Sequence, residues 1–172
     1  SIIKYLSKKN KVDLVYIDKK KNEEISNKSF KGNKFFFKQN FVSSFLNVVK
    51  ELLNLNPLQV GFFYSKEAHE FINNNHTSYD VIICHLIRST KHLPNNFTGK
   101  VFLEIKDVYS DNYKQTSQKS SFINPMRYLY SLESFLIKRC EEYCFSIFDK
   151  IILVENKNIN KINHLIKKKI IK

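Results

Sequence analysis

Apolar and polar positions follow two different periods along this chain, and these predict strands and helices in turn. Short runs rich in β-branched and apolar residues predict strands at 11–17, 35–37, 79–85, 100–105 and 149–154. Apolar residues three or four positions apart predict helices at 2–9, 41–53, 64–73, 86–92, 125–147 and 157–170. Polar segments without a period predict loops at 18–31 and 108–121, and the second is expected to be mobile.

The helical segments also predict which side chains share a face. In segment 41–53 the apolar face consists of Phe41, Phe45, Val48, Val49 and Leu52. Segment 64–73 is expected to turn Ala68, Phe71 and Ile72 inward. In the longest helix the expected seam is Leu129, Leu132, Leu136, Arg139, Cys140, Tyr143 and Ile147. The strand at 79–85 is continuously apolar, which is typical of a strand buried on both faces of a parallel sheet.

This alternation of strands and helices predicts an α/β fold, a Rossmann-like parallel sheet with right-handed crossovers and helices on both faces. Residues 1–172 suit one domain, since a compact domain typically has about 100–200 residues. Because the chain opens inside a predicted helix, the first strand of such a domain would precede Ser1. Ligands of these sheets bind at the carboxyl ends of the strands, which directs attention to Asp18, 85–88, 106–111 and 155–158.

Lysine supplies nearly all of the positive charge. The chain has 29 Lys and Arg residues against 16 Asp and Glu, a net charge of +13, yet its arginines are only Arg88, Arg127 and Arg139. Abundant Lys, Asn and Ile indicate a gene rich in A and T, so a solvated Lys-rich surface is the simplest interpretation. Nucleic acid is a disfavoured partner, because Arg reads phosphates and bases better than Lys does.

The fraction of apolar residues and the number of cysteines exclude several further classes of protein. Apolar residues make up 42% of the chain, enough for a core, which excludes a disordered polycation. No apolar run approaches the roughly 18–20 residues that cross a bilayer. Cys84, Cys140 and Cys144 are too few for a disulfide framework and lack a His/Cys pair at zinc spacing, so we expect no metal and buried reduced thiols in a cytoplasmic protein.

Two predicted strands end in residues that could carry chemistry. His85 and Arg88 follow strand 79–85 and could hold a phosphate or a sugar hydroxyl, with a capped strand end as the alternative. Asp107 follows strand 100–105 and could act as a general base, kept ionised by Lys106, with an ordinary turn aspartate as the alternative. The chain has no Walker, GxGxxG, HExxH, CxxC or GxSxG motif.

Charged residues on two predicted helices, 125–147 and 157–170, are interpreted as parts of the fold and not as functional sites. Glu133 and Glu141 lie eight positions apart on the longest helix, and their shared side is expected to be a solvated charged face. The last helix, 157–170, sets lysines against a stripe of Ile and Leu. Such helices can lie on anionic membranes, but packing of the stripe on the core is favoured.

Four segments, in this order, resemble the N-terminal half of the family 4 glycosyltransferases, which have the two-domain GT-B fold. They are 57–65 (PLQVGFFYS), 79–88 (YDVIICHLIR), 101–110 (VFLEIKDVYS), and 133–141 with 148–154 (ESFLIKRCE and FDKIILV). The opening, 1–17, fits the end of the family's first helix and its second strand. The resemblance covers about residues 57–156.

The resemblance implies transfer of a sugar from a nucleotide-activated donor to an acceptor glycan or lipid-linked glycan in cell-surface polysaccharide synthesis, without a cofactor or an obligatory metal. This chain would supply the acceptor-side domain, and donor binding would belong to a C-terminal domain after Lys172. The implied catalytic residue is Asp107, and the implied substrate-binding residues are His85, Arg88, Lys106 and Ser110. Lys106 stands where many members have His, and Glu155 where a Ser is expected. Peripheral contact with an anionic membrane at its cytoplasmic face would use the positive charge.

Two other classes of protein stay open. A nucleic-acid-binding α/β module would use the aromatic and lysine residues at 30–38, although a strand with Lys flanks is the preferred interpretation of that segment. A flavodoxin-like regulatory domain would place Asp107 at a strand end, but the acidic cluster that such domains carry after their first strand is absent from the sequence.

Overall fold

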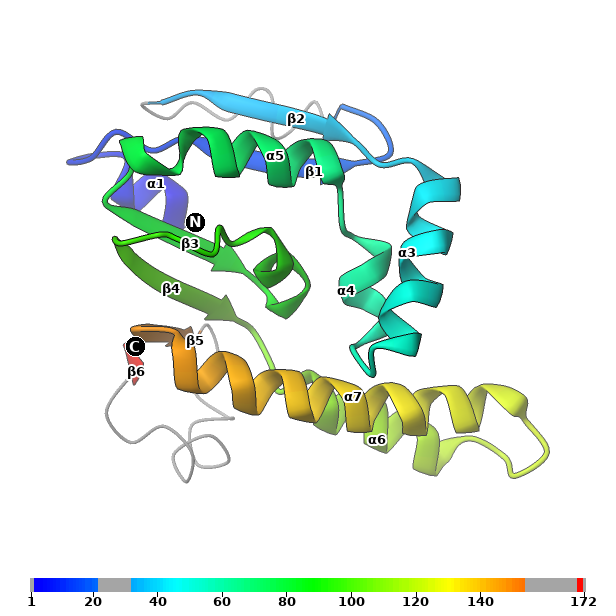
Figure 1. The fold of residues 1–172 in the computed structure, drawn as a ribbon. Coiled ribbons are helices and arrows are strands. Elements are labelled where there is room, and N and C mark those ends of the chain that lie inside the picture. Colours follow the sequence, from blue (N-terminus) through cyan, green and yellow to red (C-terminus); the bar gives the residue numbers. More distant parts are fainter. Residues whose placement is uncertain (1, 22–31, 154–169, 172) are drawn as a thin grey trace.

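The computed structural model describes residues 2–21, 32–153 and 170–171, in which parallel strands and helices form a mixed α/β fold (Figure 1). One sheet pairs β1 (Leu14–Asp18) with β2 (Lys34–Lys38). The other has the order β3 (Val81–His85), β4 (Lys100–Ile105), β5 (Lys150–Leu153) and β6 (Ile170–Ile171). The helices are α1 (Ile2–Leu6), α3 (Phe41–Leu53), α4 (Leu58–Phe62), α5 (Lys66–Asn75), α6 (Tyr109–Lys119) and α7 (Pro125–Ile147), with 3₁₀ turns η1 (His76–Ser78) and η2 (Ile87–His92).

The predicted α/β class and the parallel pairing of the strands are confirmed, but the strands form two sheets where one was expected. In Figure 1 the arrows of β1, β2, β3 and β4 point the same way, yet β1 is not hydrogen-bonded to β3. A side-chain contact links the two sheets: the Tyr79 hydroxyl donates to Asp13 Oδ2 at 2.8 Å. Burial, together with this bond to Asp13, raises the pKa of Tyr79 to about 12.

The hydrophobic core lies where β4 and β5 meet α7. Leu103, Ile105, Ile151 and Phe148 are completely buried there, and Phe145 packs with them from α7. The thiols of Cys84 and Cys144 are buried and free, as predicted, whereas Cys140 is free but only half-buried. At the edge of this sheet β3 differs from the prediction of burial on both faces, because among its residues only the side chain of Cys84 is buried.

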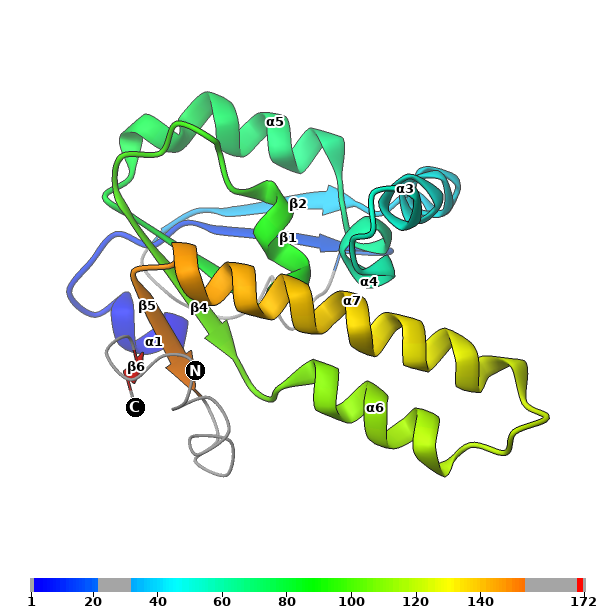
Figure 2. The same ribbon diagram turned by 60° about the horizontal axis from the view of Figure 1, so that its bottom comes forward.

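The prediction of a mobile loop at 108–121 is wrong. This segment contains helix α6, which pairs with α7 in a long hairpin (Figure 2). The two helices meet through hydroxyl groups. Ser117 Oγ donates to the Arg127 carbonyl at 3.0 Å, and Ser134 Oγ donates to the Ser110 carbonyl at 2.8 Å. A helix that packs through serines shows no apolar period, which is why the sequence pattern misses it.

Helix α7 spans the predicted residues, but its buried side differs from the predicted seam. Of that seam only Leu136 is buried; Leu129, Leu132, Tyr143 and Ile147 are exposed. The residues of α7 that are buried instead are Glu133, Leu136, Ile137, Glu141, Cys144 and Phe145. The interpretation of Glu133 and Glu141 as a solvated charged face is therefore wrong, because each of these residues is only 3% exposed.

Each buried glutamate of α7 accepts hydrogen bonds from the first turn of another helix. Glu133 accepts from the backbone N–H groups of Leu58 at 2.8 Å and Gln59 at 3.1 Å, at the start of α4. Glu141 accepts from the N–H of Ser110 at 3.3 Å and from its hydroxyl, at the start of α6. Helix starts carry unpaired N–H groups and partial positive charge, so a carboxylate there serves both needs.

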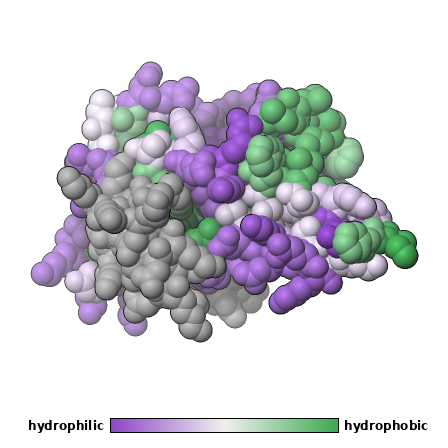
Figure 3. Space-filling view, turned by 90° about the horizontal axis from the view of Figure 1, so that it is seen from below, coloured by the Kyte–Doolittle hydropathy of each residue, from purple (hydrophilic) through white to green (hydrophobic). Residues whose placement is uncertain are grey.

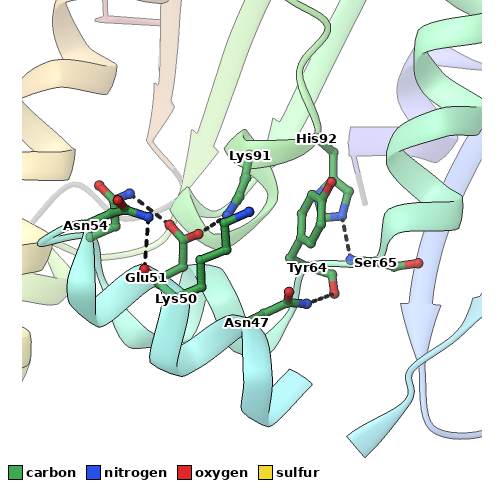
Figure 4. A network of polar contacts seen from close by, with 9 residues as sticks. Asn47, Lys50, Glu51, Asn54, Tyr64, Ser65, Lys91 and His92 are labelled. Carbon is green, nitrogen blue, oxygen red and sulfur yellow. Dashed lines mark hydrogen bonds and ion pairs between the residues drawn. The ribbon is translucent and has the colours of Figure 1, made fainter. Parts of the chain in front are cut away.

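Helix α3 is attached to the body by its polar side (Figure 4). The Glu51 side chain is 3% exposed, pairs with the Lys91 ammonium group of η2, and accepts from Asn56 Nδ2 at 2.8 Å. Asn47 Nδ2 donates to the Tyr64 carbonyl at 3.5 Å. Gly61 of α4 allows the close approach, because a Cβ there would lie 2.7 Å from the Asn47 carbonyl oxygen.

The opposite side of α3 is apolar and exposed. We call this surface the α3 apolar face; it comprises Phe41, Val42, Phe45, Leu46, Val49 and Leu53. The helix is thus confirmed at 41–53, and its buried residues are the polar Ser44 and Glu51. The predicted helix 157–170 lies outside the described residues except for Ile170, which is in β6.

The loss of the Glu133 carboxylate would destabilise the fold. In Glu133→Ala the N–H groups of Leu58 and Gln59 lose their acceptor, and a buried donor without a partner costs about 1–3 kcal/mol. We expect the free energy of unfolding, measured by urea denaturation, to fall by about 2–4 kcal/mol. The control is Glu142→Ala at an exposed position of the same helix, for which a change of about 0.5 kcal/mol or less is expected. Equal losses in the two variants would contradict the capping role.

Candidate active site

The candidate site lies at the carboxyl ends of β3 and β4. In the parallel register His85 pairs with Glu104, so the last residue of β3 stands beside the end of β4. The His85 ring donates from Nδ1 to Glu104 Oε2 at 2.8 Å. The imidazole is 55% exposed and the carboxylate 14% exposed. This carboxylate orients the ring and leaves Nε2 for a ligand or for proton transfer.

Leu86, between His85 and η2, has a backbone conformation that is rare for a residue with a side chain. Its φ is 67° and its ψ is 155°, in a region occupied almost only by glycine. The Leu86 N–H donates to the Glu104 carbonyl at 2.8 Å, and the side chain is buried, so both ends of the residue are held. Strain of this kind costs about 1–3 kcal/mol and concentrates at functional sites, which supports this turn as the candidate site.

Arg88, the third predicted residue, extends from η2 over an aromatic ring. Its guanidinium carbon lies 4.2 Å from the centre of the Phe63 ring, and stacking of this kind orients an arginine while its N–H groups stay available. The phenol of Tyr109 has a pKa raised by burial. Arg88 lowers that pKa and Asp107 raises it, so a positive and a negative charge act on the same phenol. Arg88 and Asp107 thus belong to one neighbourhood around Tyr109.

The remaining predicted residues follow β4. Lys106 is exposed and Asp107 is half-buried, both in the short turn before α6. Ser110 is 6% exposed, and its hydroxyl donates to Glu141. That bond holds the start of α6, and a contact of Ser110 with substrate stays a prediction.

The η2 turn is fixed by contacts on its far side (Figure 4). His92 accepts at Nε2 from the Ser65 N–H at 3.1 Å, and its ring stacks on Tyr64 with centroids 5.2 Å apart. Burial lowers the pKa of His92 to about 4, so the ring is neutral and can accept this bond. Lys91 pairs with Glu51 and lies 4.8 Å from the centre of the Tyr64 ring. The turn that carries Arg88 is therefore held from both ends.

Sequence reasoning missed three contributors to this site. Glu104 acts through its register with His85, Phe63 through stacking under Arg88, and Leu86 through its backbone angles. Glu104 and Phe63 do stand inside the quoted motifs, but their partners are set by the pairing of segments distant in sequence. Within residues 2–21, 32–153 and 170–171 no cluster of three or more His, Cys, Asp or Glu residues is placed to hold a metal ion.

Comparison with models of known protein families finds no match to this chain, and comparisons with curated proteins and with solved structures find none either. The described helices include none that is long and apolar enough to cross a membrane. The resemblance to family 4 glycosyltransferases accordingly stays a prediction that rests on the four quoted motifs.

Glu141 is expected to make stability depend on pH. Burial raises the pKa of Glu141 to about 7, against 4.5 for an ordinary glutamate, with a smaller contribution from Asp111 and opposed by the bonds from Ser110. The folded protein therefore holds this proton more tightly than the unfolded chain does. The Glu141 contribution is most favourable below pH 4.5 and is lost as the pH rises through about 7.

The variant Glu141→Gln removes this proton equilibrium. Relative to the wild type, its free energy of unfolding should rise by up to about 3 kcal/mol between pH 4.5 and 8, measured by urea denaturation at each pH. Glu142→Gln, an exposed change on the same helix, is the control and should show a flat difference. A flat difference for Glu141→Gln as well would contradict the assignment.

Proposed function

We propose that this chain is the acceptor-side domain of a glycosyltransferase, a Rossmann-like half of a GT-B architecture. It would act in cell-surface polysaccharide or glycan synthesis. The donor would be a nucleotide-activated sugar bound mainly by a second domain, and the acceptor a glycan or lipid-linked glycan. The reaction would take place in the cytoplasm at the inner face of an anionic membrane, where the protein would bind peripherally.

The observation that carries this proposal is the His85–Glu104 pair at the ends of two adjacent parallel strands. A ligand at the carboxyl ends of β3 and β4 would meet an oriented imidazole, the stacked guanidinium of Arg88 and the Lys106–Asp107 turn. Those are groups that recognise hydroxyls and phosphates. The strained backbone of Leu86 at the centre of this arrangement agrees with a binding role.

The sugar-transfer reaction would require one proton transfer at this domain's site. The acceptor hydroxyl gives its proton to a base while its oxygen bonds to the anomeric carbon, and the nucleoside diphosphate leaves with the electron pair of the broken bond. We assign the base to Asp107, with His85 oriented by Glu104 as the hydrogen-bond partner of the acceptor. Arg88 and Lys106 would hold phosphate oxygens.

Binding of an acceptor mimic tests the proposal. We expect the chain to bind a short-chain isoprenoid diphosphate disaccharide in titration calorimetry, with an affinity at least about tenfold weaker in Arg88→Ala, because a charge-assisted hydrogen bond contributes about 1.5–3 kcal/mol. The matched control is Asp80→Asn, since Asp80 is exposed at the opposite, amino end of β3. Residues 1–172 alone should release no nucleoside diphosphate from nucleotide sugars, because the donor domain would be separate.

Three results would contradict the proposal: no binding of the disaccharide by the wild type, equal binding by Arg88→Ala, or measurable sugar transfer by residues 1–172. A nucleic-acid-binding module is the competing function. It would gain support from binding of single-stranded DNA whose affinity falls steeply with salt, since each neutralised phosphate adds to that slope.

A further inference from the structure

The α3 apolar face is largely exposed, although the ring of Phe41 at its start lies edge-to-face against Phe62 of α4, with centroids 6.4 Å apart. Phe45 and Leu46 are 62% and 63% exposed, and the same helix contacts the protein with Ser44, Asn47 and Glu51. An amphipathic helix in a globular protein normally buries its apolar side. Contiguous apolar surface of this kind marks a docking site for another molecule or for a membrane.

A second apolar surface lies at the end of the α6–α7 hairpin. We call it the hairpin tip, which comprises Phe122, Ile123 and Met126. Phe122 is 73% exposed and Ile123 is 93% exposed. The Arg127 guanidinium carbon lies 3.8 Å from the centre of the Phe122 ring, and Arg127 Nη1 donates to the Ser120 carbonyl at 3.0 Å, so this turn is held by its own contacts.

The two surfaces lie at the same end of the molecule. In Figures 1 and 2 α3 and the hairpin tip are both on the right, and the N and C labels are on the left. Figure 3 shows separate green areas on this side of the molecule, with paler and purple atoms between them. The occupant therefore has to reach two apolar areas on different elements.

The charge around both surfaces is positive. Residues 33–50, which lead into and form most of α3, contain Lys34, Lys38 and Lys50 and no Asp or Glu. Residues 112–132, which form most of α6, the tip and the start of α7, contain Lys114, Lys119 and Arg127 and again no acidic residue. The nearest carboxylate on α3, Glu51, is buried and paired with Lys91.

We propose that the α3 apolar face and the hairpin tip together bind the surface of an anionic lipid bilayer. A bilayer is an extended, deformable surface that can contact both areas at once. Apolar side chains enter the interface while lysines remain at the level of the lipid headgroups, where they attract anionic lipids. A second copy of this chain would instead have to match a bipartite surface that is positively charged in both parts, which like charges disfavour.

This inference deepens the proposed function and rests on it for the peripheral membrane contact and the lipid-linked acceptor. Its test uses vesicles and no sugar substrate, so a loss of vesicle binding and a loss of disaccharide binding are measured separately. The carboxyl ends of β1 to β4 point toward the end of the molecule that carries both apolar surfaces (Figure 1). A bilayer bound there would present a lipid-linked acceptor on the same side as His85 and Arg88.

Sedimentation with large unilamellar vesicles tests the inference. The wild type should bind phosphatidylcholine vesicles that contain phosphatidylglycerol, and binding should be much weaker to pure phosphatidylcholine. The double variants Phe45→Ser/Leu46→Ser and Phe122→Ser/Ile123→Ser should each lower the partition coefficient at least about tenfold, since each removes two large apolar side chains from the interface. The matched control is Tyr5→Ser/Tyr143→Ser, two exposed aromatic positions outside both surfaces.

Far-ultraviolet circular dichroism and urea denaturation show whether each variant keeps its fold. Unchanged binding by both double variants would overturn the inference, and so would the absence of wild-type binding or equal binding to the two kinds of vesicle. A wild type that ignores vesicles but dimerises in sedimentation equilibrium, with monomers in Phe45→Ser/Leu46→Ser, would assign the surface to a second copy.

Discussion

The arrangement of the helices depends on two carboxylates that α7 buries. Glu133 and Glu141 each accept from backbone N–H groups at the start of another helix, α4 and α6 respectively. Neither of these helices could be placed by apolar packing alone, because α4 has five residues and α6 meets α7 largely through serines and tyrosines. Directional hydrogen bonds from one rigid helix therefore fix both.

The candidate site inherits its geometry from these contacts. Helix α6 begins two residues after Asp107, so the bond from Ser110 to Glu141 limits where the turn after β4 can go. Helix α4 precedes Phe63, which lies under Arg88, so the bonds from α4 to Glu133 fix that ring from the other side. One helix that takes no direct part in the site thus helps to position both the turn after β4 and the ring under Arg88.

Strand and helix positions followed well from the sequence where one local signal dominated. The bounds of β4 and α7 agree with the prediction because a Pro starts α7 and a short, mainly apolar run forms β4. The predicted burial of side chains was wrong where contacts between segments distant in sequence determine it. A glutamate on a helix is expected to face solvent unless N–H groups from another segment bind it. The sequence around Glu133 does not indicate that α4, which starts 75 residues earlier, supplies those groups. For the same reason the site residues His85 and Arg88 could be named, but not their partners Glu104 and Phe63.

The polar attachment of α3 has a thermodynamic consequence for how this helix opens. Separation of α3 from the body would break the Asn47–Tyr64 hydrogen bond and the ion pair of Glu51 with Lys91, whereas Phe45, Leu46 and Leu53 are already exposed and would add little new apolar surface. Heat capacity and denaturant dependence both scale with the surface that an opening exposes. The local opening of α3 would therefore be nearly insensitive to urea, whereas the core around Leu103 and Phe148 would open only with the full dependence of global unfolding.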